Sequence, residues 1–151
     1  MFRIVLPAFA LFLAIRAHAG ETLPCDPARM NCSPLVACVE ASGEVLRGAS
    51  FGADSGPFHA ESPAGVLCTG SWRRGVMGLG LAEFSCSDGR TGQSIYTYFE
   101  PESGTAVGTG RFAGGGEVRF WSGNNLERYF REVAPEERQR MACTPEAMLL
   151  S

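Results

Sequence analysis

Short runs of apolar or alternating residues, separated by glycine-rich turns, fill the chain between Leu35 and about Arg131. Runs of this length with a period of two are typical of half-buried β-strands, because successive side chains of a strand point to opposite faces. The pattern predicts these strands: Val36–Ala41, Val45–Phe51, Gly65–Trp72, Gly80–Cys86, Ser94–Glu100, Thr105–Gly110, Glu117–Trp121 and Leu126–Phe130. We therefore expect an all-β domain over residues 35–134, folded as a small antiparallel barrel or sandwich of about eight short strands.

The cysteines indicate that this domain is stabilised by disulfides. The chain has six, all of them after residue 20: Cys25, Cys32, Cys38, Cys68, Cys86 and Cys143. An even number in a small exported protein is typical of a disulfide framework. No Cys-x-x-Cys pair is present, and structural zinc sites need close ligand pairs, so we predict neither a metal nor another cofactor.

Two of the cysteines lie symmetrically in one predicted hairpin. Cys68 and Cys86 are each nine residues from Met77, so a hairpin centred there places them opposite each other. Asp88-Gly89, a strong turn dipeptide, follows the second cysteine. We predict a Cys68–Cys86 disulfide with a turn just beyond it. The other four cysteines allow three pairings, of which we expect Cys25–Cys32 and Cys38–Cys143.

The first 19 residues have the pattern of a signal peptide. Arg3 precedes an apolar run from Ile4 to Ile15, and Ala17-His18-Ala19 forms a small-x-small cleavage pattern before Gly20. The apolar run is too short to span a bilayer as a helix. We therefore expect a periplasmic or secreted protein with no transmembrane segment after cleavage.

The two ends of the remaining chain differ from its middle. Residues 20–34 are rich in proline and cysteine and predict an irregular leader. Near the other end, Pro135 and the glutamates after it favour a helix start, and arginines follow, which predicts a short helix over Pro135–Ala142. We expect residues 135–151 to form a helical tail that packs on the β domain.

The charge of the chain argues against one class of partner. There are 13 basic and 16 acidic residues, and the formal net charge is −3. A protein that neutralises many phosphates needs a net basic surface, so no nucleic acid partner is expected.

Four residues are candidates for a ligand-binding surface. Alternation places Arg119 and Trp121 on one face of their strand, and Tyr96 and Tyr98 on one face of another. If these faces meet on one surface, they form an aromatic and cationic patch suited to a sugar, an acidic ligand or a protein partner. The alternative is that these aromatic residues belong to the core.

Residues suited to catalysis are few. His59 is the one histidine after residue 19; it lies in the predicted loop Gly52–Gly65, and no Gly-x-Ser-x-Gly motif accompanies it. Several carboxylates lie on or next to predicted strands, but sequence spacing does not place any two around one substrate. They are Glu83, Asp88, Glu100, Glu102 and Glu117.

Two stretches resemble known groups of proteins. The arrangement Cys68-x-Gly70-x-Trp72 with Cys86-x-Asp88-Gly89-Arg90-x-Gly92 is similar to that of small exported or lipoprotein-like proteins of proteobacteria that have no known function. The stretch Gly104–Phe120 resembles the glycine-rich strands of small closed barrels such as the calycin and allene-oxide-cyclase-like groups. These resemblances imply a secreted β-rich module and carry over no catalytic residue.

The sequence thus favours a non-enzymatic β module that binds a ligand or protein partner in the cell envelope, or is structural there. The alternative is a small envelope hydrolase that uses His59 or paired carboxylates. A barrel with a packed interior would favour the first function. A deep cleft holding His59 or two carboxylates would favour the second.

Overall fold

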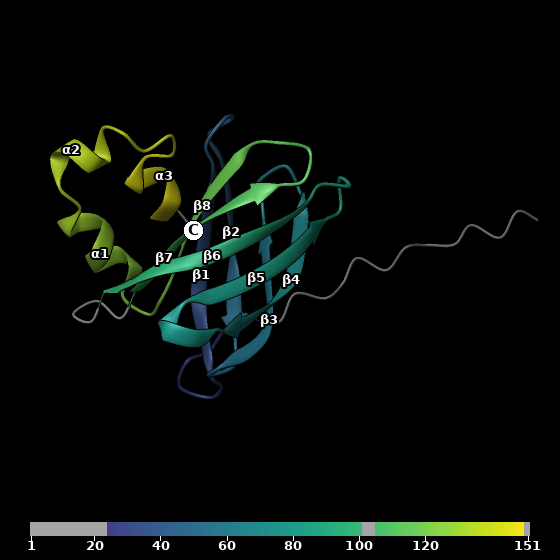
Figure 1. Ribbon diagram of the computed structural model, residues 1–151. Helices are drawn as coiled ribbons and strands as arrows, with labels where there is room; N and C mark the ends of the chain where they lie inside the picture. The colour runs from purple at the N-terminus through teal and green to yellow at the C-terminus, as the bar shows by residue number, and fades with distance from the viewer. Residues whose placement is uncertain (1–23, 101–104, 150–151) are drawn as a thin grey trace, which may run out of the picture.

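The computed structural model describes residues 24–100 and 105–149 (Figure 1). The predicted signal peptide, residues 1–19, lies outside this range, as does Glu102. Within it, no helix has the length and apolar character needed to cross a membrane.

Antiparallel strands form a closed barrel, in which each strand pairs with the next along the chain and the last pairs with the first (Figure 1). The strands are β1 (Cys32–Val39), β2 (Glu44–Phe51), β3 (Ser55–Glu61), β4 (Leu67–Arg74), β5 (Gly80–Cys86), β6 (Thr91–Glu100), β7 (Thr105–Phe112) and β8 (Glu117–Ser122). Closure removes every sheet edge, so the backbone groups of the wall pair with one another. The predicted all-β fold with about eight strands is confirmed.

The hairpin that joins β4 to β5 has the predicted register. Cys68 pairs with Cys86, and Arg74 pairs with Gly80 on either side of a short turn centred on Met77. Gly89 occupies a left-handed conformation in the next turn, and its N–H donates to the carbonyl of Cys86 at 3.0 Å. All three expected disulfides are present: Cys68–Cys86, Cys25–Cys32 and Cys38–Cys143.

Two elements differ from the sequence-based expectation. The predicted strand Leu126–Phe130 is wrong, because these residues belong to the helix α1 (Leu126–Glu132). Leu126 and Phe130 are four residues apart, so they lie on one helical face, and both are buried there. Conversely, the predicted loop around His59 contains β3. Pro57 is tolerated in this strand because pairing with β2 ends at Phe58, so its missing N–H breaks no bond on that side.

The C-terminal helices cover one side of the barrel (Figure 1). After α1 follow α2 (Pro135–Arg138) and α3 (Pro145–Leu149). The helix predicted from Pro135 therefore starts as expected and ends before Ala142. Outward-facing side chains of β1, β2 and β8 form one buried cluster with residues of this tail: Val36, Cys38, Val45, Trp121, Leu126, Phe130, Met141, Cys143 and Met148. The Cys38–Cys143 disulfide lies in this cluster and joins the tail to β1.

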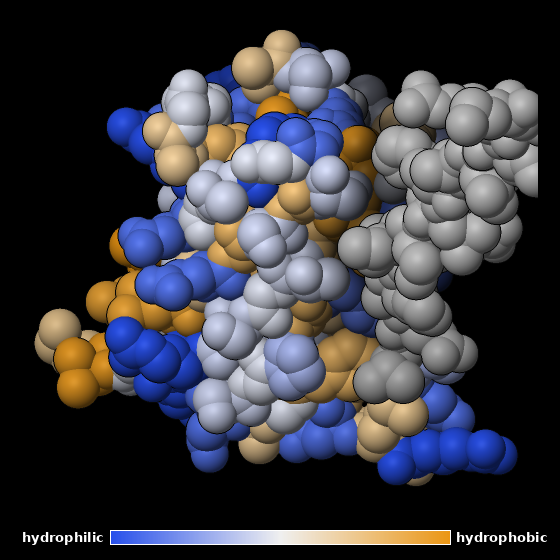
Figure 2. Space-filling view, turned by 90° about the vertical axis from the view of Figure 1, so that its right-hand side faces the viewer, coloured by the Kyte–Doolittle hydropathy of each residue, from blue (hydrophilic) through white to orange (hydrophobic). Residues whose placement is uncertain are grey.

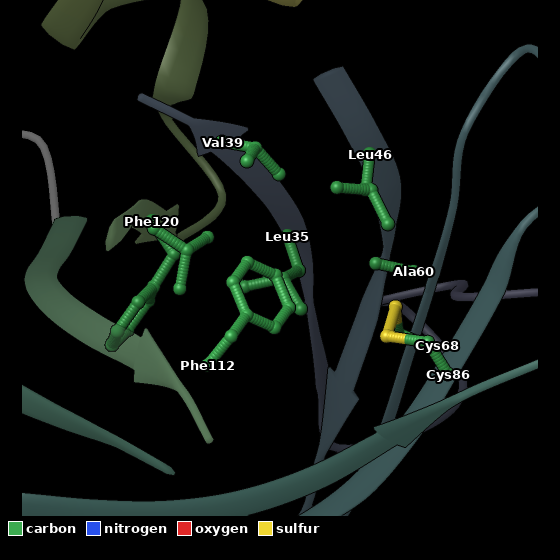
Figure 3. Packing of buried hydrophobic residues seen from close by; sticks show 9 residues of the cluster. Leu35, Val39, Leu46, Ala60, Cys68, Cys86, Phe112 and Phe120 are labelled. Atoms are coloured by element: carbon green, nitrogen blue, oxygen red, sulfur yellow. A yellow bond between two sulfur atoms is a disulfide. The ribbon is translucent and has the colours of Figure 1, made fainter. Parts of the chain in front are cut away.

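A second cluster fills the barrel interior. Figure 3 shows Leu35, Leu46, Phe112 and Phe120 converging on this space, together with the Cys68–Cys86 disulfide. Four inward aromatic residues each pair with a glycine on a neighbouring strand: Phe58 with Gly70, Tyr96 with Gly80, Phe84 with Gly92, and Phe120 with Gly108. A glycine leaves room for the opposing ring to lie across the strand. The glycine-rich strands are therefore what allows large rings to fill a small barrel.

Candidate functional site

The interior of the barrel is too full to hold a small-molecule ligand. The space left among its apolar side chains is about 50 Å³. Ligand sites usually measure about 300–1,000 Å³, whereas one water needs only about 10–15 Å³ of such space. Burial also raises the pKa of the Tyr96 hydroxyl, which borders this space, to about 12, so this side chain stays neutral. A site for a ligand or partner would therefore lie on the outer wall.

His59 lies on the outer wall, in β3. Its ring packs against Phe51, with 5.7 Å between the ring centroids. Partial burial lowers the pKa of the imidazole, and the negative charge of Glu61 opposes this shift. No hydrogen bond joins His59 to another side chain within residues 24–100 and 105–149. The geometry thus does not assemble a nucleophile and base around this histidine.

The predicted carboxylates do not form a glycosidase pair among the described side chains. Glu83 and Glu117 lie in one row on the outer wall, but β6 and β7 separate their strands. Three strand spacings of about 4.8 Å place them about 14 Å apart, well beyond the separation that glycosidases use. Asp88 is held in a turn by Arg90. The side chain of Glu100 and the whole of Glu102 lie outside the described structure.

The aromatic residues expected on one ligand-binding surface are instead on two sides of the barrel wall. Trp121 faces outward but is only 2% exposed, because α1 covers it and Phe130 packs against its ring at 5.3 Å. Tyr96 faces inward and packs edge-on against Phe120. Arg119 is partly exposed and pairs with Glu40 at 3.5 Å. The side chain of Tyr98 is not described. The expected patch is therefore not formed by the described members, since closure of the barrel places the two rings on opposite faces.

A groove of about 830 Å³ lies on the outer wall and extends from β3 to β8. Pairing between neighbouring strands aligns a polar row along it, from Ser71 on β4 through Glu83, Gln93 and Arg111 to Glu117 on β8. A second, parallel row contains Arg73, Leu81, Ile95 and Thr109. The outward positions of these consecutive strands thus converge on one surface, which we call the outer groove.

Two of the four charged side chains in the outer groove pair with each other, and a third accepts a hydrogen bond. Arg111 and Glu117 form an ion pair at 2.8 Å, and the Gln93 amide donates to the Glu83 carboxylate at 3.3 Å. Arg73 is exposed and makes no ion pair with a described residue. The aliphatic side chains of Leu81 and Ile95 lie directly opposite each other beside it. The groove therefore offers cationic, anionic and aliphatic groups at fixed spacing. The sequence did not predict the outer groove, because its residues come together only through the register of neighbouring strands.

No cluster of three or more His, Cys, Asp or Glu residues in the described part of the chain could hold a metal ion. The polar groups of the outer groove are hydroxyls, an amide and separate charges, which suit hydrogen bonding and ion pairing rather than metal coordination. The groove is thus a candidate binding surface.

Comparisons with known proteins find one structural similarity and no related sequence. No family model matches the chain, and no curated protein matches it. Among solved structures, it is similar to a de novo designed fluorescence-activating β-barrel, with a TM-score of 0.47 and 16% sequence identity. The match covers 67% of this chain and 99% of the designed one. A likeness of this extent carries no functional inference, so the function rests on the groove and the filled interior.

Proposed function

We propose that this protein is an exported, non-enzymatic β-barrel module that binds a protein partner in the cell envelope through the outer groove. One observation carries the proposal: the outer groove measures about 830 Å³, whereas the space among the interior side chains is about 50 Å³. Barrels that carry small ligands hold them in the interior. A barrel with a filled interior and a groove on its outer wall is suited to binding a partner on that wall.

The composition of the outer groove favours a polypeptide as the partner. A closed barrel has no free strand edge, so a partner cannot add a strand and must contact side chains. The groove presents Arg73, Glu83 and the Arg111–Glu117 pair beside Leu81 and Ile95. A protein segment with charges of both signs and apolar side chains complements this mixture better than a uniformly charged or purely apolar ligand does.

Two features support an envelope location. Disulfides persist in oxidising compartments, and this barrel has three of them. The sequence also begins with the pattern of a cleavable signal peptide. N-terminal sequencing of the protein from producing cells should read from Gly20. A chain that still starts at Met1 would contradict export by this route.

Site-specific photo-crosslinking tests the outer groove. A photoreactive phenylalanine analogue placed at Gln93, in the centre of the polar row, should give a discrete adduct in envelope preparations. The matched control carries the same analogue at Glu61, which is exposed on β3 outside the groove. Charge reversal by Glu83→Arg should then remove the adduct at position 93. Equal adducts at both positions, or none at 93, would reject the groove as the binding surface.

The alternative, a small hydrolase, draws no support from the described residues. His59 has no hydrogen-bonded partner among them, and Glu83 and Glu117 are separated by two strands. A hydrolase would also need a pocket in which these groups meet one substrate. The outer groove contains Glu83 and Glu117 but not His59.

A further inference from the structure

The turn between β4 and β5 exposes apolar side chains that the fold does not use. Val76 is 80% exposed and Met77 is 90% exposed, and Leu79 beside them is exposed as well. None of the three belongs to either hydrophobic cluster of the barrel. Single exposed apolar residues are normal, but several at one projecting turn indicate a contact outside the fold. We call Val76, Met77 and Leu79 the hairpin tip.

Met77 is held in an unfavourable backbone conformation in this tip. Its φ of 60° and ψ of 25° lie in the left-handed region, and it is the one residue other than glycine with positive φ in the described chain. This conformation costs free energy for a residue with a side chain, and glycine would avoid that cost. Gly75 and Gly78 lie in the same turn, yet a methionine occupies the strained position. Strain and exposure together point to a role for this side chain beyond the barrel.

The same end of the barrel carries another exposed apolar residue. Met30, 40% exposed, precedes β1, whose first residue pairs with the end of β2. The end of β4 pairs with the start of β3, so β1 begins at the end of the barrel where the hairpin tip lies. Figure 2, which views the barrel from the side of β3 and β4, shows hydrophobic residues projecting from one edge of a mainly polar wall.

Two arginines stand at the base of the hairpin tip. Arg73 and Arg74 end β4, and both are exposed. Arg74 lies 3.7 Å from Asp54, in a pair that water surrounds on most sides, whereas Arg73 makes no ion pair with a described residue. The apolar side chains thus lie at the end of the hairpin, and two guanidinium groups lie at its base. This order suits a lipid surface, where apolar groups enter the acyl boundary and arginines reach the phosphates.

From this arrangement we infer that the hairpin tip docks the barrel onto an anionic membrane surface. Removal of the predicted signal peptide, which contains Arg3 and Arg16, changes the net charge from −3 to −5. This charge does not prevent the contact, because exposed charges are screened beyond a Debye length of about 8 Å at physiological ionic strength. Few residues insert, so binding is weak and reversible. The tip thus goes beyond the proposed function: the outer groove binds the partner, and the tip, with Arg73 at its border with the groove, holds the barrel at the membrane.

Vesicle co-sedimentation tests this inference. The purified protein should bind vesicles of phosphatidylcholine mixed with phosphatidylglycerol and bind pure phosphatidylcholine vesicles much more weakly. Met77→Gly should weaken binding at least about tenfold, since it removes the most exposed apolar group. The same change relieves the left-handed strain, so the melting temperature should stay equal or rise. Loss of binding then cannot be attributed to unfolding.

Three further variants complete the test. Met77→Leu keeps an apolar side chain and should retain binding. Arg73→Gln and Arg74→Gln together should weaken binding about 25-fold, since each arginine near an anionic surface contributes about fivefold. Arg140→Gln removes an exposed arginine on the helical side and should leave binding unchanged. The inference would be overturned if the wild-type protein did not bind anionic vesicles. It would also be overturned if the Met77→Gly variant bound them as tightly as the wild type.

Discussion

At the scale of single residues, the barrel depends on glycines that lie beneath aromatic rings. A Cβ atom added to Gly108 would lie 2.4 Å from the ring of Phe120 and 2.3 Å from the carbonyl oxygen of Ile95. Gly108→Ala should therefore destabilise the protein by about 1–3 kcal/mol, because neither the backbone nor the packed ring can move freely. Urea unfolding measures this change. Gly114→Ala is the matched control, since no atom lies within 4 Å of the added Cβ, and it should be neutral or slightly stabilising.

His59 makes stability depend on pH in a predictable direction. Partial burial lowers the pKa of its imidazole from the usual 6.5. Below pH 6.5 the unfolded chain therefore takes up a proton that the folded chain does not, and stability falls until the pH passes the lower folded pKa. Thermal melts across this range should show the decline, and His59→Gln should flatten it. An NMR titration in which the His59 ring protonates above pH 6.5 would contradict the prediction.

At the scale of elements, the helical tail is held to the barrel wall by Trp121. This side chain is buried between β8 and α1, against Phe130. Trp121→Ala should cost about 3–5 kcal/mol, because it opens a cavity that the neighbouring helix cannot fill. Thermal unfolding would show the loss. Arg119→Ala, two residues away on the same face, should cost less, about 1 kcal/mol, because it removes one long ion pair, at 3.5 Å from Glu40, and no large apolar side chain. Equal effects would mean that α1 does not cover Trp121 in solution.

At the scale of the whole molecule, one ion pair closes an end of the barrel. Arg90, in the turn after β5, lies 2.9 Å from Glu44 at the start of β2 and 2.7 Å from Asp88. Its guanidinium also lies 5.0 Å from the centre of the Phe112 ring, which belongs to the interior. The backbone N–H of Arg90 donates to the Asp88 carboxylate, and so does its positively charged guanidinium. Both contacts hold the pKa of Asp88 below its usual value. Glu44 and Arg90 thus join hairpins from different parts of the wall.

A double-mutant cycle measures how much this closure contributes. The side chains of Arg90 and Glu44 are only 28% and 23% exposed, whereas those of Arg111 and Glu117 are 75% and 63% exposed at a similar distance. We expect a coupling of about 1 kcal/mol for Glu44–Arg90 and about 0.3 kcal/mol for Arg111–Glu117, because water screens the exposed pair more strongly. The cycles use Glu→Gln and Arg→Met changes. Equal couplings would show that Arg90 is hydrated at the barrel end.

The sequence by itself determined the features that depend on near neighbours. Alternating runs and glycine turns predicted the β fold, since strand geometry repeats every two residues. The equal spacing of Cys68 and Cys86 about Met77 fixed the hairpin register and the disulfide. Local pattern failed where two periods overlap: Leu126–Phe130 is short enough to fit a strand or a helix, and packing against the barrel decided for the helix.

Only the tertiary structure decided which face of each strand is inside. Alternation separates the two faces of a strand without saying which one the barrel encloses. Closure turned Tyr96 inward, while the helical tail buried Trp121 on the outer face, so two rings that the sequence grouped together are divided by the wall. The outer groove likewise needs Glu83, Arg111 and Glu117 in register across neighbouring strands. That alignment exists only once the strands have paired, because strand pairing brings together residues that are distant in the chain.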